Sequence, residues 1–284
     1  ISQEKDNPET TGRFGTGFIA THVLSKVVQV KSNRINRAGK ISGFIATLYR
    51  KGINDSDIIN DFKAMQRSQK RNLTPFEFTT FTYEIKSEES REYVKLGLKH
   101  LKEHISTALI NCPEIKSIVL NQNGKQVKYF VTGPERKKAN SITFSIYDIC
   151  ANSDIIHRFI ALENKENNIN ISIEIDGENK IVPIKKNTES ISIVFPLVGS
   201  YLHKLPFYLN SSKFEPSTER NALILNGKEK IDGALTNTGI NRFLLMKCTD
   251  LYRDLITVVN AISCGNIFNL TNGLMLSREP YSTF

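Results

Sequence analysis

The chain has 284 residues, 39% of them hydrophobic and 24% charged, and a formal net charge of +9. This composition supports a sizeable core and excludes a disordered chain, and the length favours about two domains. No apolar run approaches the roughly 18 residues of a membrane-spanning helix, and the polar, acidic start lacks the pattern of a secretion signal.

The first part of the chain has a mixed helix and strand pattern. Residues 1–11 are polar and predict a loop, and a glycine-rich segment then leads into a short helix up to Ser25. The following pattern predicts strands over 27–30, 44–49 and 76–85 and a helical stretch over 55–66.

A longer helix is expected to begin after Ser87, whose side chain can cap it, and to end before Pro113. Its expected apolar positions are Tyr93, Leu96, Leu101, Ile105, Ala108 and Leu109. Strand patterns dominate after this helix, so we place a domain boundary at 112, giving domains 1–112 and 113–284.

The second domain is predicted to be strand-rich α+β. Asn123-Gly124 predicts a hairpin between 118–120 and 127–131, and Asp176-Gly177 a second one. Further strands are expected over 141–147, 169–175, 180–184 and 191–198. A long helix over 241–262 would bury Phe243, Leu244, Leu251, Leu255, Val258 and Val259.

The four cysteines form no Cys-x-x-Cys pair, which predicts reduced thiols in a cytoplasmic protein and no zinc site. His100 and His104 are four residues apart on the expected helix but have no third ligand nearby, so we interpret them as part of a solvated face. We expect His22 to be a packed histidine rather than a phosphate ligand.

The glycine-rich segment carries the clearest chemical signal. Gly12, Gly15 and Gly17 precede a helix, and glycines allow backbone amides to approach a phosphate while the helix N-terminus attracts anions. The spacing is neither that of a dinucleotide-binding loop nor that of a P-loop. The glycines alone are equally consistent with a tight structural turn.

The flanking residues resemble the GHKL ATPases, which include gyrase, histidine kinases and the ninety-kilodalton heat-shock chaperone. The resembling segment is Gly12-Arg13-Phe14-Gly15-Thr16-Gly17-Phe18, followed by 21–25 and the strand over 27–30. It is most similar to the branch with that chaperone and sacsin, in which this motif closes the ATP lid. About 60 residues downstream, 79–83 resembles the family's Gly-Thr strand, with Thr80 as the matching threonine beneath the adenine pocket.

The resemblance implies a fold and a ligand. The first domain would be the C-terminal part of a Bergerat-type ATP-binding α/β sandwich, and residues 12–18 and Thr80 would contact ATP. The family's catalytic Glu, Mg²⁺-binding Asn and Asp-x-Gly-x-Gly precede the lid. Because only eleven residues precede Gly12 and the first is Ile1, we expect the Mg²⁺ ligands and these groups to lie upstream of this chain.

A third resemblance covers part of the second domain. The segments 195–196, 205–210 and 214–221 are similar to the region after the ATPase domain in bacterial proteins with sacsin-like ATP-binding domains. Related ATPases send a basic residue from a following domain to the γ-phosphate, and Arg220 is the first candidate and Lys204 the second. Alternatively, Arg220 pairs locally with Glu219 or Glu215.

Two functions remain open from the sequence. The first is an ATP-binding protein and ATPase in which lid closure rearranges the domains and acts on a protein client, with homodimerisation as in the family. The second is a non-enzymatic module, with an incomplete ATP site, that binds protein or nucleic acid. The positive charge permits nucleic acid as a partner, but the clusters 67–71 and 136–138 have no interleaved aromatic residues and are equally consistent with a solvated surface.

Overall fold

The computed structural model describes residues 21–36, 38–203, 205–219 and 221–271. The chain divides into two compact units, the first ending at Leu101 and the second beginning at Lys102. The division falls inside helix α3 (Glu88–Asn111), before the boundary expected at 112. The reason is that the last turns of α3 pack into the core of the second unit.

The first unit contains an antiparallel four-stranded sheet in the order β3-β2-β1-β4. Its elements are η1 (Thr21–Val23), β1 (Val27–Ile35), β2 (Ile41–Tyr49), α2 (Asp55–Ser68), β3 (Lys70–Leu73) and β4 (Thr80–Tyr83). The two expected strands at 27–30 and 44–49 and the expected helical stretch are confirmed. The strand expected over 76–85 is shorter, because pairing with β1 extends only from Thr80 to Tyr83.

Helix α3 begins as its sequence predicts. The backbone amide of Ser90 donates to Oγ of Ser87 at 3.0 Å, which is an N-cap hydrogen bond. Ile105, Ala108 and Leu109 are buried as expected. The other three expected apolar positions were wrong, because Tyr93, Leu96 and Leu101 are exposed in the described structure.

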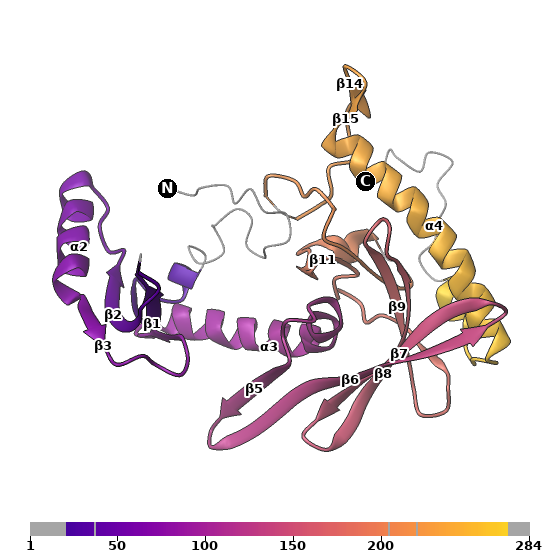
Figure 1. Cartoon of the computed structure of the whole chain (residues 1–284), viewed down its shortest axis with the longest axis horizontal. Helices are drawn as coiled ribbons and strands as arrows, with labels where there is room; N and C mark the ends of the chain where they lie inside the picture. The colour runs from indigo at the N-terminus through magenta and orange to yellow at the C-terminus, as the bar shows by residue number, and fades with distance from the viewer. Residues whose placement is uncertain (1–20, 37, 204, 220, 272–284) are drawn as a thin grey trace. The chain divides into compact units, whose positions relative to one another are not determined.

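The second unit is mixed α+β with a large, curled sheet of nine strands (Figure 1). The order is β12-β11-β13-β9-β8-β7-β6-β5, and β10 pairs with β9. The strands are β5 (Ser117–Gln122), β6 (Lys125–Ala139), β7 (Ile142–Ala151), β8 (Asp154–Asn164), β9 (Ile169–Ile175), β10 (Ile181–Val182), β11 (Ile191–Ile193), β12 (Phe195–Pro196) and β13 (Tyr208–Ser211). The other elements are η2 (Ser200–His203), the hairpin of β14 (Lys230–Ile231) and β15 (Ala234–Leu235), α4 (Asn237–Ala261) and η3 (Ile267–Leu270).

The Asn123-Gly124 hairpin is confirmed between β5 and β6. Both residues have positive φ, 54° and 75° respectively, as a two-residue hairpin turn requires.

Helices contribute apolar side chains to two separate cores in this unit. Leu244, Leu255 and Val258 of α4 pack in the larger core with the strands (Figure 1). The end of α3 packs in the smaller one with Ile149 and Phe159.

Strand β8 has no counterpart among the strands expected from the sequence. Residues 159–162 are Phe-Ile-Ala-Leu, and all four are buried. Phe159 belongs to the core with α3, whereas Ile160 belongs to the core with α4. A strand with buried side chains on both faces lacks the alternation that makes a half-buried strand recognisable.

Two other expectations were wrong. The strand expected over 191–198 is interrupted at Val194, whose φ is 69°, so that β11 and β12 pair with each other. Phe243 was expected in the buried face of α4 but is 38% exposed. The remaining expected core positions of that helix are buried, and they are Leu244, Leu251, Leu255, Val258 and Val259.

All four cysteines are buried and free. Burial raises the pKa of the Cys248 thiol to about 12, so this thiol is kept neutral. None of the described helices is long and apolar enough to cross a membrane.

Candidate functional site

The structure describes one of the sequence-predicted site residues. Thr80 is the first residue of β4 and is exposed. The other predicted residues lie outside the described residues, and they are Gly12, Arg13, Phe14, Gly15, Thr16, Gly17, Phe18, Lys204 and Arg220. The site is therefore built from the segments that adjoin them.

The segment after the glycine motif is hydrogen-bonded to the end of the strand that carries Thr80. Ser25 follows η1, and its single hydroxyl proton is shared between the carbonyls of Glu84, at 3.0 Å from Oγ, and Val27, at 2.8 Å. The next strand, β1, pairs antiparallel with β4. Segments that are far apart in the sequence are thus neighbours in the first unit.

The sheet offers a polar surface around Thr80. The register places Thr80 opposite Lys31 and Thr82 opposite Gln29. Because successive side chains of a strand point to opposite faces, these four residues share one face and Val28 lies on the other. Thr80 and Thr82 are exposed, whereas Val28 is completely buried.

A cavity of about 340 Å³ lies beside η1 and the first turns of α3. Its lining is mixed and includes the charged side chains of Lys26 and Glu89 beside Val23. His22 also lines it but is only 5% exposed, which confirms the expectation of a packed histidine. Burial, with a contribution from the nearby Arg50, lowers the pKa of His22 below its usual value. The ring is therefore held in its neutral form.

The segment around Arg220 is anchored on both sides by one buried amide. Asn241 of α4 is fully buried, and its Oδ1 accepts a hydrogen bond from the amide of Glu215 at 2.8 Å. Its Nδ2 donates to the carbonyls of Glu215 and Ile224 at 2.8 and 2.9 Å. Ser217 also pairs with Ala222 through its backbone amide. The Asn241 side chain therefore fixes the two ends of the 215–224 segment.

Two histidine–carboxylate pairs were not found from the sequence. His104 was expected on a solvated face, but its side chain is 12% exposed and its Nε2 lies 2.6 Å from Oε2 of Glu189. His157 Nδ1 lies 2.6 Å from Oε1 of Glu174 on the sheet. In each pair the histidine and the glutamate lie far apart in the sequence, so no local spacing of residues could have predicted the contact.

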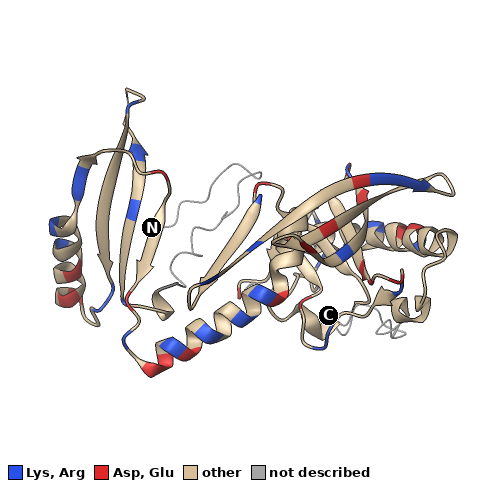
Figure 2. Cartoon of the chain, turned by 90° about the horizontal axis from the view of Figure 1, so that it is seen from below, with Lys and Arg blue, Asp and Glu red and all other residues tan. Residues whose placement is uncertain are grey.

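The basic run of residues 136–138 lies near the end of the long hairpin of β6 and β7 (Figure 2). Lys137 pairs with Glu135 at 3.2 Å, which offsets part of its charge. Within the described residues, no group of three or more His, Cys, Asp or Glu side chains could hold a metal ion. The Mg²⁺ ligands were expected upstream of this chain, so the described residues do not test that expectation.

Comparisons with known proteins found no matching family model, no matching curated protein and no matching solved structure.

Proposed function

We propose that the protein binds ATP in the manner of the GHKL ATPases, with residues 12–18 as the phosphate-binding lid. The observation that carries this proposal is the hydrogen bond from Ser25 to the carbonyl of Glu84, together with the pairing of β1 with β4. The two motifs on which the resemblance depends are 60 residues apart in sequence, yet the segments that carry or follow them adjoin in the first unit.

The face of the sheet that carries Thr80 supports a role in binding the nucleotide. Thr80 is exposed beside Lys31, so its hydroxyl is available to a ligand. In the proposed site this hydroxyl forms a hydrogen bond beneath the adenine. The first unit is then part of a Bergerat-type domain, and Mg²⁺ supplies charge neutralisation for the phosphates when it is bound.

The second unit has a catalytic role in this proposal. Arg220 neutralises charge that develops on the transferred phosphoryl group, and Lys204 is the second candidate for that role. The hydrogen bonds of Asn241 to Glu215 and Ile224 support this assignment, because they fix the described positions on either side of the candidate residue. In this proposal, closure of the lid on ATP rearranges the domains, and that rearrangement acts on a protein client.

The lid assignment is tested by ATP titration calorimetry with Mg²⁺ on the protein as its gene encodes it. The Gly15→Ala/Gly17→Ala variant should lose measurable binding, because the added Cβ atoms keep the phosphate from the amides. Gly97→Ala is a matched control, because a Cβ there meets nothing within 4 Å. Unchanged ATP affinity in the double variant would overturn the assignment and favour the interaction module.

The role of Thr80 is tested separately with Thr80→Val, which keeps the shape and removes the hydroxyl. We expect the ATP affinity to fall about tenfold, the usual effect of losing one hydrogen bond in a site. Thr82→Val alters the same face of the same strand and should change the affinity less than about twofold. Equal effects of the two substitutions would contradict a specific contact.

The catalytic role of Arg220 is tested by steady-state ATP hydrolysis. Arg220→Ala should lower kcat and leave the Kd for ATP unchanged, because the residue acts on the transition state. A loss of affinity with unchanged kcat would contradict this role.

A further inference from the structure

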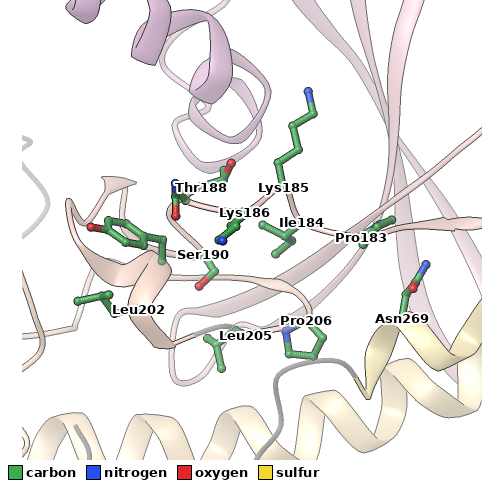
Figure 3. A pocket seen from close by; sticks show the side chains of 12 residues that line it. Pro183, Ile184, Lys185, Lys186, Thr188, Ser190, Leu202, Leu205, Pro206 and Asn269 are labelled. Carbon is green, nitrogen blue, oxygen red and sulfur yellow. The ribbon is translucent and has the colours of Figure 1, made fainter.

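A cavity of about 550 Å³ lies in the second unit, beside the loop 183–190 and η2 (Figure 3). This volume is in the range of small-ligand sites. Much of its lining is apolar and includes Ile184, Leu202, Leu205 and Pro206. None of its lining residues is an aspartate or a glutamate, whereas two of them are lysines, Lys185 and Lys186.

Hydrogen bonds fix the walls of this cavity. The fully buried Ser200 of η2 accepts from the amide of Ile191 at 3.1 Å and donates to its carbonyl at 3.3 Å. Asn269 of η3 is also buried and donates to the carbonyl of Ile181 at 2.8 Å. These bonds connect three separate segments around the cavity, so the site is preformed.

The two lysines are positioned differently. The amide of Thr188 donates to the carbonyl of Lys185 at 3.1 Å, which closes a turn with Lys186 inside it. In the view of Figure 3, Lys186 lies between Thr188, Ile184 and Ser190, whereas Lys185 extends away from the other labelled side chains. Both lysines line the cavity, and Lys186 is the one that lies among its other labelled residues in this view.

No carboxylate neutralises Lys186 within the described part of the chain. Neither Lys186 nor Lys185 forms an ion pair there. The nearest acid in the sequence, Glu189, is buried and bonded to His104 at 2.6 Å. The Thr188 hydroxyl also has no hydrogen-bond partner among the described side chains. Lys186 is exposed at the edge of the cavity, and its ammonium and the Thr188 hydroxyl beside apolar walls favour an anion that is attached to an apolar body.

We propose that this cavity binds a single-chain amphiphile with an anionic head, either a carboxylate or a phosphate monoester. Lys186 and Thr188 bind the head, and Ile184, Leu202, Leu205 and Pro206 cover the chain. A neutral amphiphile leaves the ammonium without a counter-charge, and a small anion leaves the apolar walls uncovered. Both therefore bind more weakly than the amphiphile that carries both features.

Calorimetric titration of the full chain with decanoate, decyl phosphate and decanol tests the ligand class. Decanoate or decyl phosphate should bind saturably, and decanol at least about tenfold more weakly, because it lacks the charge. The tighter of the two anions identifies the carboxylate or the phosphate as the head. Equal binding of decanol, or no saturable binding of either anion, would overturn the proposal.

Matched variants test the site. Lys186→Gln should weaken the binding of the preferred anion about tenfold and leave decanol unchanged, because one charge-assisted contact is lost. Lys185→Gln makes the same charge change nearby and should weaken binding less than about threefold. Equal losses in the two variants would show that only the general positive charge matters, which contradicts the site.

A second pair of variants does not depend on the lysines. Leu202 lines the cavity and is 69% exposed, so its substitution should not disturb folding. Leu202→Glu should weaken anion binding more than Leu202→Gln, because it places a charge against the apolar chain of the ligand. Identical affinities in these two variants would overturn the assignment of Leu202 to the chain, with equal unfolding temperatures as the check on folding.

Discussion

His104 Nε2 lies 2.6 Å from Oε2 of Glu189, and the two side chains are only 12% and 7% exposed. The histidine is in α3, and the glutamate is just before β11. This contact therefore joins helix α3 to the segment before β11, which is the second strand from one edge of the large sheet. Because both groups are removed from water, each depends on the other for its hydrogen bonding.

We expect a strong energetic coupling between these two residues. In a double-mutant cycle with His104→Ala and Glu189→Ala, measured by urea unfolding, the coupling free energy should be about 2 kcal/mol. The His157–Glu174 pair has the same 2.6 Å distance but is 35% and 21% exposed. It should couple by less than about 1 kcal/mol. Equal coupling in the two pairs would contradict the role of burial.

Asn241 should contribute more to stability than any exposed residue of α4. Asn241→Ala leaves one amide and two carbonyls of the 215–224 segment without their partner. We expect the free energy of unfolding to fall by about 3 kcal/mol. Met246→Ala on the same helix is the control, since Met246 is 58% exposed. If the free energy of unfolding falls by less than about 1 kcal/mol in Asn241→Ala, water replaces these three hydrogen bonds at little cost.

The pair of Arg158 and Asp148 predicts a specific acid sensitivity. Arg158 Nε and Nη2 donate to the carboxylate at 2.6 and 2.9 Å, and this holds the pKa of Asp148 below its usual value. A carboxyl with a lowered folded pKa stabilises the fold above its unfolded pKa, and the contribution is lost as the pH falls through the folded pKa.

Arg158→Gln should therefore destabilise the protein at pH 7 by less than about 1 kcal/mol, because the guanidinium is partly exposed. The difference between wild type and variant should disappear once Asp148 is protonated in both states. Urea unfolding of both proteins, from neutral pH to pH ~3, measures this difference in the free energy of unfolding. A difference that is constant over this whole range would contradict the assignment to the ion pair.

His22 predicts a proton linkage of the same sign as Asp148, at a higher pH. Burial lowers its pKa in the folded chain from 6.5, so the unfolded chain binds the proton first on acidification. Stability is fully present above the unfolded pKa and falls as the pH decreases from there towards the folded pKa. His22→Gln should remove this part of the pH dependence, as measured by unfolding between pH ~8 and pH ~5. If His22→Gln has the same pH dependence as the wild type, the buried ring is not the group that titrates.

Local physics made much of the fold predictable. The Ser87 cap, the Asn123-Gly124 turn and the apolar stripe of α4 each depend on residues a few positions apart, and all three are present. The glycine motif and Thr80 were likewise recognised from short segments. Their role in ATP binding stays a prediction, because residues 12–18 lie outside the described region.

The rest was decided by contacts between distant segments. Strand β8 is buried on both faces because helices contribute to both cores, and no alternation in its own sequence records this. The chain turns at Val194 because its amide donates to Oδ1 of Asn210, a residue of another strand. The His104–Glu189 pair and the cavity beside Lys186 likewise depend on the tertiary structure. The sequence by itself determined the elements whose energetics are local, and burial and pairing across the fold decided which side chains meet.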